Sequence, residues 1–168
     1  PLYSSATSDV YKRQYQGTVT MPTGEFVLGP GGTLEGATGF ASVQTANIKM
    51  GEEDLNAHVF DLLRIKEFGE SRFTLKQLES PTAGALEFGT ARQFKALGDF
   101  VMKGVTLPLV ANAEVTPVVL ESGEPRLLVD ATYSLRLNEA YEIEGPPGPD
   151  PLNDTLEFFV KVYLKPKP

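Results

Sequence analysis

One segment of the chain alternates more regularly than any other: Leu127-Leu128-Val129-Asp130-Ala131-Thr132-Tyr133-Ser134-Leu135-Arg136. Its odd-numbered side chains are apolar and its even-numbered side chains are mostly polar. The same period of two occurs in residues 107–116 and again in residues 156–165. This pattern is typical of strands in an antiparallel sheet that buries one face. Repeated strands with turn residues between them favour a barrel or a sandwich over alternating strands and helices.

Weaker strand signals precede these three segments. Apolar residues begin to alternate at Phe26 and Leu28, after a turn at residues 22–24, and Gly29-Pro30-Gly31-Gly32 is a strong turn signal. Further strands are expected at residues 40–48, 72–78, 85–94 and 99–102. The last two could also form one strand that bends around Leu97-Gly98.

One segment has a different period and predicts a short helix. Residues 53–65 place Leu55, Val59, Leu62 and Leu63 near helical spacing, after acidic residues that suit a helix N-terminus. We expect this helix to end near Phe68-Gly69. The proline-rich residues 144–151 cannot continue a strand, so they are expected to form an exposed connection.

The composition limits the possible functions. The chain has 168 residues, which fits one domain, and its net charge is −7 from 15 basic and 22 acidic residues. This balance argues against a nucleic-acid partner and against electrostatic docking on an anionic membrane. Because there is no cysteine, thiolate catalysis, disulfides and zinc–thiolate sites are excluded. No apolar run approaches the ~20 residues of a membrane-spanning helix.

The side chains that carry chemistry do not converge on a catalytic or metal site. His58 is the only histidine, and no Gly-x-Ser-x-Gly motif accompanies it. Asp54 lies four residues before His58, so both would share one helix face, but one imidazole among carboxylates is a weak metal site. We therefore interpret Asp54 as a helix cap and His58 as a structural residue. We predict no enzymatic activity, no metal and no cofactor.

Residues 1–14 differ in character from the rest of the chain. They have no initiator methionine, no apolar segment and no clear period, and they resemble a translated sequencing-adapter sequence. We expect them to be a non-native tail and residues 15–168 to be the folded domain.

Two blocks of sequence connect the chain to a known family. The first, Gly51-Glu52-Glu53-Asp54-Leu55-Asn56-Ala57-His58, has Asn56 where the family has a second aspartate. The second runs from Gly98 to Leu109 and carries the motif residues Gly98, Gly104, Val105, Thr106 and Pro108. Together they resemble the YceI-like, lipocalin-like polyisoprenoid-binding family, from about Gln16 to Lys165. Family members begin with a strand that carries an Asp-x-x-His-Ser pattern, which is absent here, so an N-terminal strand is expected to be missing.

The resemblance implies a lipocalin-like antiparallel barrel of about eight strands with one short helix. It also implies storage or transport of a long apolar ligand, such as an isoprenoid, a quinone or a fatty-acid derivative, in the periplasm or after secretion. His58 and the loop near Gly104 could form the rim. The alternative is an interaction protein whose barrel is filled by its own side chains, because a small barrel can be either filled or hollow. The candidate ligand-binding residues were chosen by strand face: Phe26, Phe40, Phe73, Leu75, Phe88, Leu109, Ala111, Tyr133, Leu135, Phe158 and Val160.

Overall fold

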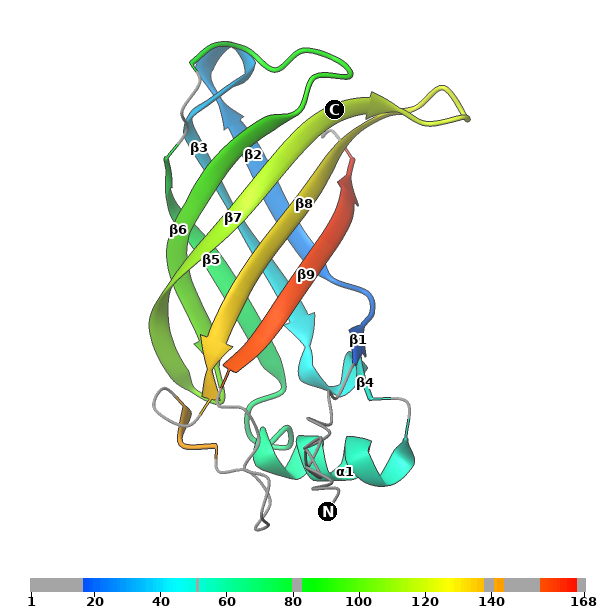
Figure 1. Cartoon of the computed structure of the whole chain (residues 1–168), viewed down its shortest axis with the longest axis vertical. Helices are drawn as coiled ribbons and strands as arrows, with labels where there is room; N and C mark the ends of the chain where they lie inside the picture. The colour runs from blue at the N-terminus through cyan, green and yellow to red at the C-terminus, as the bar shows by residue number, and fades with distance from the viewer. Residues whose placement is uncertain (1–16, 51, 80–82, 138–140, 144–154, 166–168) are drawn as a thin grey trace, which may run out of the picture.

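The computed structural model describes residues 17–50, 52–79, 83–137, 141–143 and 155–165. Seven strands form one antiparallel sheet in the order β2-β3-β5-β6-β7-β8-β9. Their bounds are β2 Thr23–Gly29, β3 Thr33–Gln44, β5 Glu70–Glu79, β6 Arg92–Met102, β7 Val105–Val119, β8 Pro125–Arg136 and β9 Thr155–Leu164. The sheet curls strongly, so that β7, β8 and β9 lie across from β2 and β3 (Figure 1).

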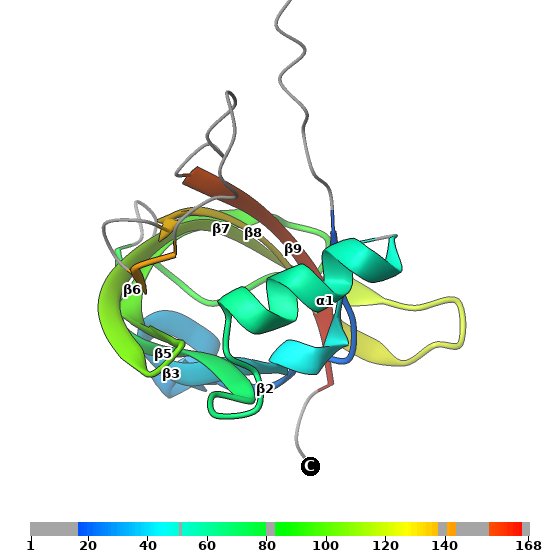
Figure 2. The same cartoon turned by 90° about the horizontal axis from the view of Figure 1, so that it is seen from below.

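Shorter elements lie at the ends of this sheet. Strands β1 (Thr18–Val19) and β4 (Ile48–Lys49) form a separate two-stranded ribbon, and 3-10 turns occupy Pro30–Gly32 and Thr45–Asn47. The helix α1 (Glu53–Leu62) lies across one end of the curled sheet, as Figure 2 shows from below. The all-β, barrel-like fold with one short helix, predicted from the sequence, is therefore confirmed.

The predicted elements agree with the structure except in three places. The strand expected at residues 40–48 ends at Gln44, where the 3-10 turn Thr45–Asn47 begins. The helix ends at Leu62 rather than near Phe68-Gly69, because the chain then turns through Arg64, which has a φ of 50°. The strand expected at residues 85–94 is wrong over residues 85–91, since β6 begins only at Arg92. From Arg92 onward it is one continuous strand through Gly98 to Met102. The loop expected at residues 144–151 lies outside the described residues.

The interior of the sheet holds two clusters of buried apolar side chains. The helix-end cluster, under α1, contains Leu63, Phe100, Met102, Leu109, Leu135, Tyr141 and Ile143. The far-end cluster contains Leu34, Phe94, Ala96, Ala111, Ala113 and Val115. Phe73 and Tyr133 pack against both clusters, so apolar packing is continuous along the interior.

The two ends of the strand order, β2 and β9, form a seam. Among the described residues no backbone pairing joins these two strands. The interior side chains of β6 and β7 are mostly buried, whereas those of β8 and β9 and Phe26 and Leu28 of β2 are mostly half-buried. The interior is therefore closed along β6 and β7 and more accessible to solvent toward the seam.

Candidate binding site on the interior face of the sheet

The interior face near the seam is apolar and aromatic. Tyr133 of β8 lies opposite Phe158 of β9 in the strand register, and their rings stack with centroids 4.7 Å apart. On its other side, the ring of Phe100 lies 6.1 Å away in a tilted arrangement. Around these rings, Leu127, Val129 and Ala131 continue the same face of β8 as partly buried residues of the far-end cluster. The result is an apolar surface that solvent can still reach.

Two tyrosine hydroxyls lie in this apolar environment. Burial, together with nearby Tyr141, raises the pKa of Tyr133 to about 12. Burial also raises the pKa of Tyr141, whose side chain is 1% exposed. The hydroxyl of Tyr141 has no hydrogen-bond partner in the part of the chain that the structure describes. Both phenols therefore stay neutral and can act as hydrogen-bonding groups in an apolar interior.

Nine of the eleven candidate residues share the interior face. They come from five strands, and their positions follow from the cross-strand register, in which directly paired residues lie on one face. These residues are Phe26, Phe73, Leu75, Leu109, Ala111, Tyr133, Leu135, Phe158 and Val160.

Phe40 was expected in the interior but lies on the outer face. It pairs with Glu25 and Thr74, and the guanidinium of Arg72 lies 3.7 Å from the centre of its ring. The interior positions on either side are Gly39 and Ala41. A Cβ atom at Gly39 would lie 3.3 Å from the ring of Phe26. Small residues are therefore needed on the inside of β3, and the large ring is directed outward.

Phe88 was also expected in the interior but lies in an exposed loop. Its side chain is 66% exposed. The loop folds through Gly89, which has a φ of 73° and donates its N–H to the carbonyl of Pro117 at 2.8 Å. This turn interrupts the apparent alternation of residues 85–94.

The second sequence block forms a strand, a tight turn and a strand. Lys103 and Gly104 have φ values of 50° and 74°, as a type I′ hairpin turn requires. Gly104 also contacts Phe68, since a Cβ atom there would lie 2.5 Å from its ring. Val105 packs against the helix-end cluster, while Thr106 is exposed. Pro108 faces outward in the part of β7 that pairs only with β6, so no bond to β8 is lost.

The first sequence block leads into α1. Asp54 and His58 are both exposed on this helix, and Gly51 lies outside the described residues. The expected cap by Asp54 is wrong, because the N-cap residue is Glu52 and no side chain caps the helix. Instead, the carbonyl of the Asn56 side chain accepts a hydrogen bond of 2.7 Å from the N–H of Met50. Asn56 thus fixes the chain that enters the helix.

Sequence reasoning did not single out several residues of the interior. Phe94 and Phe100 are buried on β6, but Leu97-Gly98 obscures the alternation between them. Tyr141 lies outside any strand, so no period indicates its burial. Arg92 lies two positions before Phe94 on the same face of the strand. Its charge predicts an outward position, so the sequence does not indicate that it faces the interior.

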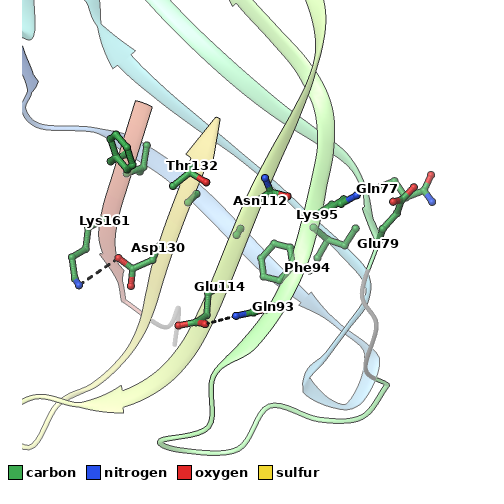
Figure 3. A pocket seen from close by; sticks show the side chains of 15 residues that line it. Gln77, Glu79, Gln93, Phe94, Lys95, Asn112, Glu114, Asp130, Thr132 and Lys161 are labelled. Atoms are coloured by element: carbon green, nitrogen blue, oxygen red, sulfur yellow. Dashed lines mark hydrogen bonds and ion pairs between the residues drawn. The ribbon is translucent and has the colours of Figure 1, made fainter. Parts of the chain in front are cut away.

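The outer face of β5 to β9 carries an open depression of about 1290 Å³. Figure 3 shows the polar side chains that line it, from Gln77 and Glu79 at one side to Lys161 at the other. Gln93 donates to Glu114 at 3.2 Å, and Lys161 lies 3.4 Å from Asp130. These two pairs satisfy four of the polar groups, and the depression is open to solvent rather than enclosed by the sheet.

The described residues offer no candidate for a metal site or for a membrane-spanning helix. Within the described residues, no group of three or more histidine, aspartate or glutamate side chains could hold a metal ion. No helix in the same part of the chain is long and apolar enough to cross a membrane.

These features define the class of protein: an all-β, lipocalin-like barrel whose interior is apolar and whose helix α1 lies across an end. Residues 3–145 match the family described as the YceI-like domain. The chain belongs to the YceI-like family.

Solved structures agree with this fold. The YceI protein of Campylobacter jejuni is similar at a TM-score of 0.72 and 14% identity, over 92% of this chain and 86% of that one. BcnA of Burkholderia cenocepacia is similar at a TM-score of 0.57 and 13% identity, over 78% of this chain and 74% of that one. A search among curated proteins gave no match.

Proposed function

We propose that this protein binds a long apolar ligand of the isoprenoid, quinone or fatty-acid class along the interior face of its sheet. The observation that carries the proposal is the half-buried apolar surface of β8 and β9, centred on the stacked Tyr133 and Phe158. Membership in the YceI-like family, whose barrels bind polyisoprenoids, supports it.

The energetics suit such a ligand. Each methylene that moves from water to an apolar surface contributes about 0.8 kcal/mol. A chain of a dozen carbons therefore gains enough to offset the loss of its translational and conformational freedom. No catalytic cluster is needed, so the proposed role is storage or transport without chemistry. A periplasmic or secreted location is part of the same proposal and rests on family membership.

A matched pair of variants on β9 tests this proposal. Val160 faces the interior and pairs with Ala131, whereas its sequence neighbour Phe159 faces outward and is 80% exposed. Val160→Asp places a charge on the proposed surface, and Phe159→Asp places the same charge outside. We expect Val160→Asp to weaken uptake of a fluorescent polyene fatty acid by tenfold or more, because burying a carboxylate is costly. Phe159→Asp should bind like the unaltered protein.

Extraction of the purified protein with organic solvent gives an independent reading. Mass spectrometry of the extract should identify a co-purifying lipid. An empty extract, combined with no uptake of the fluorescent probe by the unaltered protein, would overturn the proposal.

That negative result would favour an interaction protein with a filled interior. The observation that supports this alternative is the close packing of Phe100, Tyr133 and Phe158 across the inside of the sheet. On that reading, Val160→Asp lowers the thermal stability but no ligand raises it.

A further inference from the structure

One charged side chain, that of Arg92, lies on the interior face of the described strands. On the described residues of β2, β3 and β5 to β9, every other charged side chain that the register places lies at an outward position. The register does not place Glu35, which is exposed, or Lys76, which forms an ion pair with the outward Asp99. Arg92 is half-buried and lies directly opposite Val115, which is 0% exposed, on the same face as the buried Phe94. Its stem therefore begins among apolar side chains.

The guanidinium of Arg92 lacks an anionic partner. Its Nε is buried and has no hydrogen-bond acceptor, and no ion pair to Arg92 occurs in the described part of the chain. The nearest acidic residue across the ladder, Glu114, faces the outside and accepts a hydrogen bond from Gln93. A cation with a buried, unpaired N–H is costly, and an anion beside it would offset that cost.

Arg92 also lies at a distinct end of the interior. It begins β6, next to the far-end cluster, whereas α1 and the helix-end cluster cover the opposite end of the sheet (Figure 1). A chain that lies along the interior from Arg92 would pass the far-end cluster and reach the rings of Tyr133 and Phe158. One end of the path is therefore cationic, and the rest is apolar.

We propose that the ligand is a single-chain amphiphile with an anionic head, a carboxylate or a phosphate, and that Arg92 binds this head. The planar guanidinium presents paired N–H donors that match the oxygens of either group. The apolar tail then lies along β8 and β9. This inference rests on the proposed function, because it requires the tail to occupy the interior face.

Three compounds that share one tail distinguish the contribution of the head to affinity from that of the tail: hexadecanoate, hexadecyl phosphate and hexadecanol. Each displaces a neutral fluorescent alkyl probe from the delipidated protein. We expect the unaltered protein to prefer at least one of the two anions over the alcohol by about tenfold or more, as a charge-assisted hydrogen bond would give. The stronger of the two anions identifies the head group.

Substitutions then assign the preference to Arg92. Arg92→Gln should remove it and leave the affinity for hexadecanol within about twofold, while Arg92→Lys should keep part of it. The control is Lys95→Gln on the outward face of the same strand, which should keep the full preference. Circular dichroism and thermal melting show that each variant is folded.

The outcomes separate the two proposals. Equal affinity of the unaltered protein for all three compounds would overturn the role of Arg92 but not the binding of an apolar tail. A preference that survives Arg92→Gln, or that Lys95→Gln removes, would overturn it too. If none of the compounds displaces the probe, both this inference and the proposed function are wrong.

Discussion

The ring of Phe73 lies against Gly98 on the neighbouring strand. A Cβ atom at Gly98 would come within 2.7 Å of two carbons of that ring, and closer still to the carbonyl oxygen of Thr74. The β5–β6 register shifts by one residue at this place, between Leu75 and Gln77. Gly98 thus allows a large aromatic ring to lie inside a strongly curved part of the sheet.

Gly98→Ala is therefore expected to destabilise the protein by about 1–3 kcal/mol, because the added methyl overpacks the contact with Phe73. Denaturant unfolding measures this change. The control is Gly69→Ala, where the nearest atom to a new Cβ would be 3.6 Å away and the packing is ordinary. Equal stability of the two variants would show that the close approach at Gly98 has no energetic consequence.

A second glycine contact lies in the β6–β7 hairpin, where Gly104 contacts Phe68. Gly104→Ala should lower the free energy of unfolding by more than Gly123→Ala, which changes a glycine in the β7–β8 turn. Both glycines have a positive φ, but only Gly104 has a neighbour in the space that a Cβ atom would fill. The difference in unfolding free energy, about 1 kcal/mol or more, isolates the contact. It should shrink when Phe68 is also replaced by alanine, and a difference that persists would contradict this explanation.

The strict alternation of β7, β8 and β9 made these strands predictable from the sequence. Each residue in such a strand faces either the apolar interior or solvent, so the side-chain type reports the face. The same reasoning placed Tyr133 and Phe158 on the interior face. It also separated Phe73 from Arg72 on β5.

Prediction failed where non-local packing decides the outcome. Phe40 faces outward because the inside of β3 must stay small beside Phe26 and Phe73, which only the strand pairing reveals. Phe88 was assigned to a strand because the turn at Gly89 depends on a hydrogen bond to distant Pro117. Tyr141 was missed because it lies outside any strand, and Arg92 because a charged residue normally indicates an outward position.

The buried phenol of Tyr133 predicts a loss of stability at high pH. Its pKa is about 12 in the folded state and about 10 in the unfolded chain, so its stabilising effect is complete below pH 10. As the pH rises from 10 to 12, the unfolded chain ionises first, and stability falls by about 2 kcal/mol. Tyr133→Phe should flatten this part of the curve of unfolding free energy against pH.

The control for that experiment is Tyr163→Phe, which removes a tyrosine that is 54% exposed on the outer face of β9. The loss of stability above pH 10 should persist in this variant. Tyrosinate absorbance, recorded in the same titration, should show a late-ionising group that Tyr133→Phe removes. If every tyrosine of the unaltered protein ionised early in the titration, this result would contradict the burial of Tyr133.

Phe40 and Phe158 provide the final comparison, because both are aromatic residues on strands but they lie on opposite faces of the sheet. Phe158→Ala removes the stacking partner of Tyr133 and apolar surface from the proposed site, so ligand affinity should fall by about tenfold or more. Phe40→Ala removes only the ring beneath Arg72 on the outside, and affinity should stay within about twofold. Uptake of the same fluorescent fatty acid measures both. Since the structure directs the ring of Phe40 away from the interior, an equal loss in the two variants would mean that the ligand does not distinguish the two faces, and the interior would no longer be the site.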